Sequence, residues 1–482
     1  MSFSKNQLIL FGLTAHVLAA FFSIGAHQAD EIFQVFEFAG YKIGLNSAAE
    51  LPWEFHEQMR SGIQPMIAFV ITKTLNAFSI QNPFTVASII RMLQALFSFI
   101  VTVQLLKFLE KEIVSNSAKL WLWAFGLLFW CLPYFHARFS SENFSETIFI
   151  WALLLVLKPK AIKSPYVSFL TAGLLFGIAF VCRFQLCFMI LGVFGWLMFF
   201  RKTKILFFIS CFIGIIFALG VGLLVDYWLY GKWTLSWWNY LDLNLFQNKA
   251  SVFGSEPFYF YFEQAFLQLI PPFSLIIIFC VIAFWLKFKT HFITWVTLPF
   301  ILLHFFVNHK ELRFLFPVLN FLPFMLIYYF EAVPLSQNKS LLFIKTKRFM
   351  RFAVIVNIIA LCYYTLKPAS NSIQTLNKIY DLVKGASPVL LFDASDPYNN
   401  LASLHYFRNP AITTVDLKTD SIKRMNIPLY YFSEKFNESE HIVVQDQTFI
   451  KIYSNFPSWF QYLNFNGWLG RAGTYSIYRR QD

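Results

Sequence analysis

ILFFISCFIGIIFALGVGLLV, residues 205–225, is an uninterrupted apolar run of 21 residues without a charged side chain. A helix rises about 1.5 Å per residue, so a run of this length spans the roughly 30 Å hydrocarbon core of a bilayer. Similar runs recur along the first three quarters of the chain. Only 13% of all residues are charged, about half of the roughly 25% typical of water-soluble globular proteins. We therefore predict a polytopic membrane protein.

The apolar runs predict an all-α membrane module of about eleven spanning helices. These are expected near residues 7–26, 87–106, 119–135, 144–157, 166–181, 184–200, 205–225, 264–286, 291–307, 314–330 and 352–366. The first run lacks a strong basic segment and a small-residue cleavage site, so we interpret it as a retained helix and not a signal peptide. The six cysteines lie in or beside apolar runs and form no CxxC pair, which is typical of small buried residues.

The distribution of Lys and Arg predicts the orientation in the membrane. The short loops on one side carry 15 of these residues, whereas much longer segments on the other side carry 9. Cytoplasmic loops are the ones enriched in positive charge. The N-terminus is therefore predicted to be cytoplasmic, while the first loop (26–86) and the C-terminus are predicted to be extracytoplasmic. The net charge of +13 is then explained by contact with anionic lipid, without a nucleic-acid partner.

The last 116 residues differ in character from the rest. Residues 367–482 contain 22 charged side chains and no long apolar run. Strands are expected at 388–393, 411–417, 441–444 and 474–479, and a helix at 399–407 after Asp396-Pro397. We predict a transmembrane module over 1–366 and a small extracytoplasmic α/β domain over 367–482.

The first of three polar clusters on the predicted outer side is HQADE, residues 27–31. Asp30 and Glu31 lie beside His27 where the first helix leaves the bilayer, and charges are costly there unless they are solvated or used. A general base must be an ionised group within hydrogen-bonding reach of the acceptor hydroxyl. The cluster fits such a base, and it also fits an ordinary polar helix end.

The second cluster is LPWEFHEQMRSGIQP, residues 51–65, in which aromatic and aliphatic residues alternate with charged ones. This pattern predicts a short helix lying in the membrane interface, either as the roof of a cavity for a lipid-linked substrate or as a plain surface helix. The third cluster is HKELR, residues 309–313. Lys310 and Arg313 share a helix face and could hold a phosphate, although a polar turn at headgroup depth has the same composition.

Taken in order, these segments resemble glycosyltransferase family 22, the lipid-phosphate-mannose-dependent mannosyltransferases of glycosylphosphatidylinositol and N-glycan assembly. The family has an HxDE-like motif, a TWEW…RS…P pattern and an HKE-x-RF-x-x-P motif. The first motif corresponds to His27 with Asp30-Glu31, which has one additional residue between the His and the Asp. The second corresponds to Trp53-Glu54-Phe55 with Arg60-Ser61 and Pro65, where Phe55 replaces the second Trp. The third corresponds to residues 309–317. Weaker similarity covers 226–233 and 239–259.

The resemblance implies a GT-C type fold with an extracytoplasmic active site and a polyprenyl or dolichyl phosphate mannose donor. It implies an inverting transfer to a glycan or glycolipid acceptor, with Asp30 as the base and Glu31 assisting. The implied phosphate-binding residues are Lys310, Arg313 and His309. Those implied to position the acceptor or lipid are His27, Gln34, Trp53, Glu54 and Arg60.

No cofactor is expected to be obligatory, because the departing lipid phosphate needs no acid catalyst or metal. A divalent cation held by His27, Asp30, Glu31 and His309 is the less favoured alternative. A transporter or flippase of lipid-linked sugars, the same fold with another sugar, and a non-catalytic scaffold remain open as alternatives. The expected location is a bacterial inner membrane or the endoplasmic reticulum.

Overall fold

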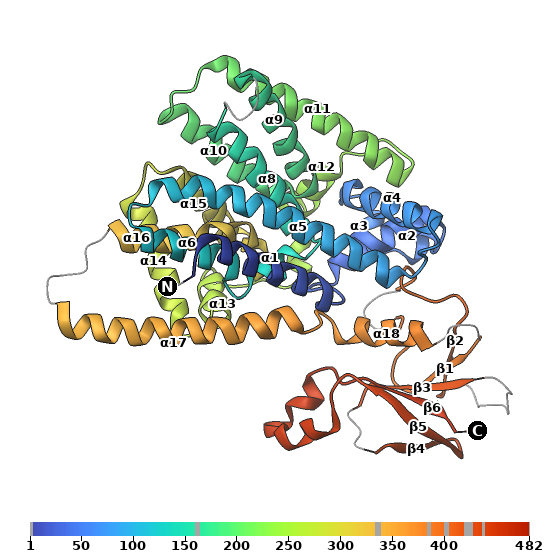
Figure 1. Ribbon diagram of the computed structural model, residues 1–482. Helices are drawn as coiled ribbons and strands as arrows, with labels where there is room; N and C mark the ends of the chain where they lie inside the picture. The colour runs from blue at the N-terminus through green and yellow to red at the C-terminus, as the bar shows by residue number, and fades with distance from the viewer. Residues whose placement is uncertain are drawn as a thin grey trace. The chain divides into compact units, whose positions relative to one another are not determined.

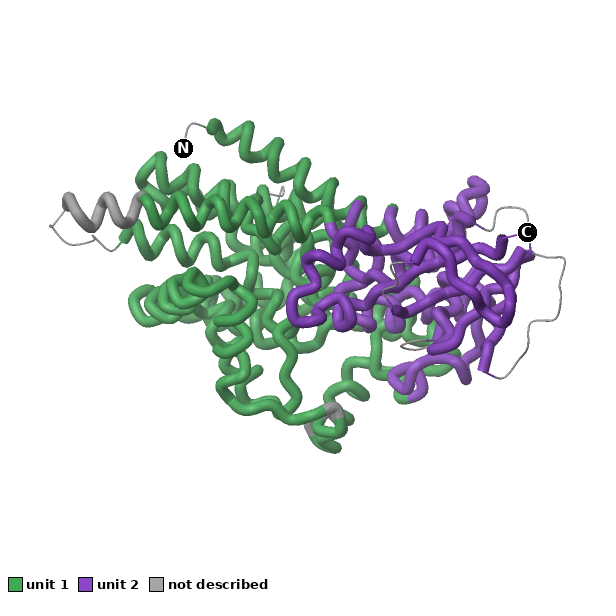
Figure 2. The backbone as a smooth tube through the Cα atoms, turned by 90° about the horizontal axis from the view of Figure 1, so that it is seen from below, with its two compact units in different colours: residues 1–21, 57–67, 89–366 green, residues 22–56, 68–88, 367–482 purple. Residues whose placement is uncertain are grey.

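The computed structural model describes residues 3–159, 164–332, 339–382, 387–399, 404–418, 428–435 and 439–481. The chain forms two compact units (Figure 2). Unit 1 consists of Met1–Phe21, Glu57–Ile67 and Ile89–Leu366, and unit 2 of Phe22–His56, Ala68–Ser88 and Lys367–Asp482. Most of the predicted first outer loop therefore belongs to the same unit as the C-terminal segment. The division into domains 1–366 and 367–482 stays a prediction.

Unit 1 is helical, and each of the eleven predicted spans overlaps at least one of its helices (Figure 1). Its helices are α1 (Lys5–Phe22), α5 (Pro83–Leu109, whose first turns lie in unit 2), α6 (Asn116–Leu128), α7 (Leu132–His136), α8 (Ser141–Leu157), α9 (Pro165–Cys182), α10 (Cys187–Phe199), α11 (Ile205–Tyr230), α12 (Ser236–Leu241), α13 (Phe260–Gln268), α14 (Phe273–Lys287), α15 (Phe292–Phe306), α16 (Leu322–Ala332) and α17 (Lys339–Leu366).

The apolar helices confirm the prediction of a multi-pass membrane protein. Among the described residues, six helices are long and apolar enough to cross a membrane, or up to seven if a bent pair is one span. Several predicted spans are broken, for example where Leu269–Pro272 separates α13 from α14. The mostly helical architecture is confirmed, whereas the number of eleven spans stays a prediction.

Helices α9 and α11 pack side by side (Figure 1) through a stripe of small residues. A Cβ atom on Gly173 would lie 1.9 Å from the carbonyl oxygen of Cys211, and one on Gly214 would lie 2.2 Å from that of Leu170. Such contacts exclude any side chain at either position. Close approach of helix backbones through small residues four apart is a recurrent way to join helices in membranes, where lipid removes the hydrophobic driving force.

We expect Gly173→Ile to destabilise the protein strongly, by more than about 1–3 kcal/mol, since the backbone of α11 must move to admit the side chain. Gly220→Ile is the matched control, because a Cβ atom at Gly220 on α11 would meet nothing within 4 Å. Thermal unfolding of the purified protein in detergent measures both. Equal unfolding temperatures for the two variants would contradict the packing described above.

Unit 2 contains a six-stranded sheet with the order β2-β1-β3-β6-β5-β4 (Figure 1). The strands are β1 (Val389–Phe392), β2 (Thr413–Asp416), β3 (Leu429–Ser433), β4 (His441–Val444), β5 (Gln447–Ser454) and β6 (Ser476–Arg480). The two pairs that β1 forms are parallel and the other three are antiparallel. The remaining regular elements of unit 2 are a π-helix (Ile32–Glu37), α2 (Phe38–Ile43), α3 (Trp53–His56), α4 (Ile63–Ala77, which begins in unit 1), α18 (Asn371–Leu382) and three 3₁₀ helices (Ala48–Glu50, Ser458–Leu463 and Phe465–Arg471).

The four predicted strands are confirmed, but β3 and β5 were not predicted. The β4–β5 hairpin turns at Gln445 and Asp446, which both have positive φ angles (45° and 62°), and neither residue gives the Asn-Gly signal usual for such a turn. Residues 400–403 of the predicted helix at 399–407 lie outside the described part of the chain, and 404–407 contain a turn. The single helix predicted over 51–65 is wrong, because α3 and α4 are separated at residues 57–62.

Candidate active site

The polar cluster after α1 lies in unit 2 and leads directly into the π-helix. The Glu31 carboxylate is buried and accepts a hydrogen bond from the backbone N–H of His27 at 3.0 Å. Asp30, beside it, is half-buried. Glu31 therefore closes the turn that follows α1, while Asp30 keeps access to solvent. π-helical turns are rare and frequently mark functional sites.

Two of the residues predicted to position the acceptor contact each other in the same unit. The side-chain amide of Gln34 donates a 2.9 Å hydrogen bond to the Glu54 carboxylate, and both side chains are buried. Glu54 follows Trp53 in the first turn of α3. This bond connects two motifs that lie 20 residues apart and fixes α3 against the π-helix.

Arg60 lies in unit 1, on the segment between α3 and α4, and residues of α11 hold that segment. The Tyr230 hydroxyl donates to the backbone carbonyl of Arg60 at 2.6 Å. The buried Asp226 carboxylate accepts from the backbone N–H of Gly62 at 2.8 Å. The guanidinium of Arg60 lies over the ring of Tyr240, 4.9 Å from its centroid. Two residues of the segment 226–233 thus hold the backbone at Arg60 and Gly62.

A cluster of buried charges in unit 1 surrounds the Glu142 carboxylate at the start of α8. Arg183, between α9 and α10, binds this carboxylate at 2.8 Å, and Arg313 lies 3.8 Å from it. The Arg313 guanidinium also makes two hydrogen bonds to Glu311, of 2.7 Å and 2.9 Å. His309 lies 3.2 Å from the same Glu311 carboxylate. The buried Glu142 carboxylate is therefore paired directly with Arg183, whereas Arg313 is paired mainly with Glu311.

Lys310 holds the backbone of this region together. Its ammonium donates to the carbonyl oxygen of Val307 at 2.6 Å and to that of Glu256 at 3.0 Å. Desolvation lowers the pKa of the Lys310 ammonium, and the negative charge of Glu256 opposes this effect. Lys310 thereby joins the end of α15 to the segment before α13, a structural task that the sequence did not indicate.

Arg183 differs from the other cations of the cluster. It is only 5% exposed, and its Nε and Nη2 atoms have no hydrogen-bond partner among the described residues. Burying donors of a charged group without partners is costly. The sequence signal for this residue was a single arginine between two apolar runs, which fitted a lipid-facing anchor as well as a ligand-binding residue.

The predicted site residues are divided between the two units. Unit 2 contains His27, Asp30, Glu31, Gln34, Trp53 and Glu54, and unit 1 contains Arg60, His309, Lys310 and Arg313. Within unit 2 the structure pairs His27 with Glu31 and Gln34 with Glu54. Within unit 1 it joins His309 and Arg313 through Glu311.

Glu37, at the end of the π-helix, connects the segment between α1 and α5 to the C-terminal segment within unit 2. Its carboxylate is 1% exposed and accepts hydrogen bonds from the backbone N–H of Tyr406 at 3.1 Å and the amide of Asn46 at 2.9 Å. The Tyr406 hydroxyl in turn lies 2.7 Å from that of Thr72. Burial raises the pKa of Glu37 to about 8, against the opposing effect of these hydrogen bonds.

This raised pKa predicts a dependence of stability on pH. Folded Glu37 keeps its proton at a pH where the unfolded chain has lost it. Its contribution to the free energy of unfolding is therefore complete below about pH 4.5 and is lost as the pH rises through about 8. We expect the unfolding temperature to fall between pH 6 and pH 8.5, and to fall less in Glu37→Gln. Parallel pH profiles for the two proteins would contradict this assignment.

Comparison with known proteins gives three kinds of match. The model of the Alg9-like mannosyltransferase family matches residues 7–388. Human GPI alpha-1,2-mannosyltransferase 3 is 27% identical over 65% of this chain and 55% of its own length. The bovine protein of the same name is 26% identical over 83% of this chain and 72% of its own length. GPI mannosyltransferase 3 of Candida albicans is 27% identical over 60% of this chain and 57% of its own length. The chain thus spans between about half and three quarters of the length of these relatives.

A solved structure shows the same fold. ArnT from Cupriavidus metallidurans, in a crystal structure bound to undecaprenyl phosphate, superimposes with a TM-score of 0.50 over 98% of this chain and 97% of its own. The two sequences are 9% identical. The match therefore supports the predicted GT-C type architecture and carries no information about substrate.

Proposed function

Because the chain belongs to the Alg9-like mannosyltransferase family, we propose that it transfers mannose from a polyprenyl or dolichyl phosphate donor to a hydroxyl group of a glycan or glycolipid. The membership confirms the resemblance to glycosyltransferase family 22 that the motifs indicated. The names of the relatives, GPI alpha-1,2-mannosyltransferase 3, support a glycolipid acceptor and an α-1,2 linkage.

The observation that carries the proposal is the buried cluster of Arg183, Glu142 and Arg313. The charges of the cluster are matched, because Glu142 pairs with Arg183 and Glu311 pairs with Arg313. The buried Nε and Nη2 atoms of Arg183 nevertheless have no hydrogen-bond partner among the described residues, and burying such donors is costly. An anionic ligand with several acceptor oxygens removes that cost, and arginine offers a fork of donors that suits phosphate. We assign the donor phosphate to the free donors of Arg183, together with Arg313 and His309. Lys310 holds the surrounding backbone.

In the proposed reaction, Asp30 takes the proton from the acceptor hydroxyl as the hydroxyl oxygen attacks the anomeric carbon of mannose. The bond between that carbon and the phosphate oxygen breaks, and the lipid phosphate leaves with the electron pair. Attack from the opposite face inverts the β-linked donor to an α-mannoside. The growing charge on the phosphate is stabilised by the fixed guanidinium groups. No obligatory metal or cofactor is required, because the phosphate leaves without being protonated.

The substrate-positioning residues belong to the two motifs of the first outer loop. We propose that Glu31 and His27 shape the turn that carries Asp30. Gln34, Glu54, Trp53 and Arg60 are proposed to orient the acceptor and the lipid near it. The active site is proposed to lie on the extracytoplasmic side, in agreement with the orientation that the Lys and Arg distribution predicts.

The proposed function is tested by incubating the purified full-length protein with radiolabelled polyprenyl phosphate mannose and a panel of glycolipid and glycan acceptors. We expect label in a glycolipid product, released by an α-mannosidase that is specific for the α anomer. Transfer with retained β configuration would contradict the inverting mechanism. Movement of the labelled donor across proteoliposome membranes without any transfer would instead identify a flippase.

A further inference from the structure

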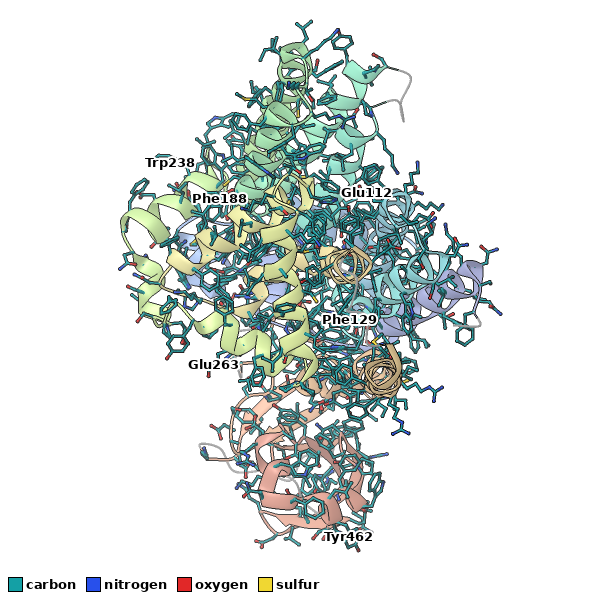
Figure 3. The ribbon with its side chains drawn as sticks, turned by 90° about the vertical axis from the view of Figure 1, so that its left-hand side faces the viewer. Glu112, Phe129, Phe188, Trp238, Glu263 and Tyr462 are labelled. Carbon is teal, nitrogen blue, oxygen red and sulfur yellow. The ribbon has the colours of Figure 1, made fainter. Side chains whose placement is uncertain are left out.

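A short segment between β5 and β6 exposes four large apolar side chains to solvent. They lie in two consecutive 3₁₀ helices, Ser458–Leu463 and Phe465–Arg471. The exposed fractions are 53% for Trp459, 76% for Tyr462, 43% for Leu463 and 74% for Phe465. Tyr462 is labelled in Figure 3. We call these four residues the aromatic tip. Contiguous exposed apolar groups usually mark a site of interaction.

The aromatic tip is held by a defined structure beneath it. The rings of Phe456, Phe460 and Trp468 pack against one another, with centroids 5.4 Å, 5.8 Å and 6.1 Å apart. The indole N–H of Trp468 donates to the backbone carbonyl of Leu463 at 2.6 Å. The side-chain oxygen of Asn464 accepts from the backbone N–H of Leu469 at 2.9 Å. The contacts among these three half-buried rings and the two hydrogen bonds give the segment a defined conformation.

The charge around the aromatic tip indicates the kind of surface that it fits. Residues 455–475, which join β5 to β6 and include the aromatic tip, contain no Asp or Glu and include the exposed Arg471. Trp and Tyr prefer the membrane–water interface, because their rings are apolar and their N–H and O–H groups remain wet. Aromatic and basic residues together match the headgroup region of a bilayer that contains anionic lipid.

The connectivity of the chain brings a lipid surface within reach. Three of the five covalent junctions between unit 1 and unit 2 lie at the ends of apolar helices: at Phe22, the last residue of α1; at Ser88, in the first turns of α5; and at Lys367, directly after α17. Each of these helices is long and apolar enough to cross a membrane. Because unit 2 is tethered to these helices, its surface encounters lipid at a high effective concentration, and a modest affinity is sufficient for it to bind the membrane.

We propose that the aromatic tip inserts into the interfacial region of the membrane that the apolar helices cross, and thereby docks the C-terminal segment on the lipid surface. The occupant of this apolar surface is lipid of the outer leaflet, with anionic headgroups beside Arg471. The inference rests on exposure, charge and connectivity. It is independent of the sugar-transfer reaction proposed above.

The test uses the full-length protein in nanodiscs that contain anionic lipid. In a Cys362→Ser background, which removes the exposed cysteine, a nitroxide is attached after Tyr462→Cys. Power-saturation electron paramagnetic resonance then compares collisions of the nitroxide with oxygen and with a water-soluble nickel chelate. We expect oxygen to dominate, as for a label at headgroup depth or below. The signal of the labelled Cys362→Ser parent is subtracted.

Val443→Cys is the matched control, because Val443 on β4 is an apolar residue of the same unit that is 71% exposed and lies outside the aromatic tip. Its label is expected to collide mainly with the nickel chelate. If Tyr462→Cys fails to fold, Phe465→Cys reports on the same surface. Equal accessibility of the two labels to the nickel chelate would overturn the proposal. Protection of the aromatic-tip label from both reagents would overturn it too, because that result indicates a protein contact.

Discussion

Asp30→Asn is expected to lower kcat for mannosyl transfer by about 10²–10⁴-fold, the usual contribution of a general base. Asparagine retains the size of the side chain and removes only its ability to accept the proton of the acceptor hydroxyl. The KM for the lipid-linked donor is expected to change little, since the proposed phosphate site lies on other residues. Steady-state transfer assays with radiolabelled donor measure both constants.

Asp381→Asn is the matched control for this substitution. Asp381 is an exposed residue of α18 in the same unit and has no proposed role in binding or transfer. Its variant is expected to retain the activity of the unsubstituted protein. If Asp30→Asn keeps more than about a tenth of the activity, the general base is not Asp30, because that loss falls below the range expected for such a group.

Arg183→Gln is expected to lower kcat/KM for the donor by about 10²–10³-fold, as removal of a preorganised donor at a developing charge does. The substitution removes the guanidinium whose Nε and Nη2 atoms have no partner among the described residues. Affinity for the lipid monophosphate product, measured as competitive inhibition of transfer, is expected to fall as well. Arg201→Gln is the control, since Arg201 donates instead to the backbone carbonyls of Val156 and Leu157.

Loss of Arg183 alone weakens the compensation of the buried Glu142 carboxylate, and breaking a buried ion pair costs about 3–5 kcal/mol of stability. The double variant Arg183→Gln/Glu142→Gln removes both charges and separates binding from folding. We expect the double variant to unfold near the temperature of the unsubstituted protein and still to bind the lipid monophosphate weakly. Normal product inhibition in a folded double variant would show that the phosphate lies elsewhere, whether or not the chain transfers mannose.

The candidate site could be predicted from sequence wherever neighbouring residues carry the chemistry. Asp30 with Glu31, Trp53 with Glu54, and 309–313 each combine charge and aromatic character within a few positions, so a short motif is enough to identify them. The sequence shows Arg183 as a single charge between two apolar runs but does not indicate its role, because that role depends on Glu142, 41 residues earlier. The motif predicts that Lys310 binds phosphate, and the structure shows that its ammonium binds two backbone carbonyls.

The sequence by itself determined that this is a membrane protein, that the apolar runs of unit 1 form helices, and which family the chain belongs to. These properties follow from the hydrophobicity of contiguous runs and from motifs that are local in the chain. Only the tertiary structure decided which charges pair and which backbones touch. Glu37 meets the backbone of Tyr406 across 369 positions, and Gly173 meets Cys211 across the contact between α9 and α11. Such contacts arise when separate elements pack together, and no local pattern of hydrophobicity or charge specifies the partner.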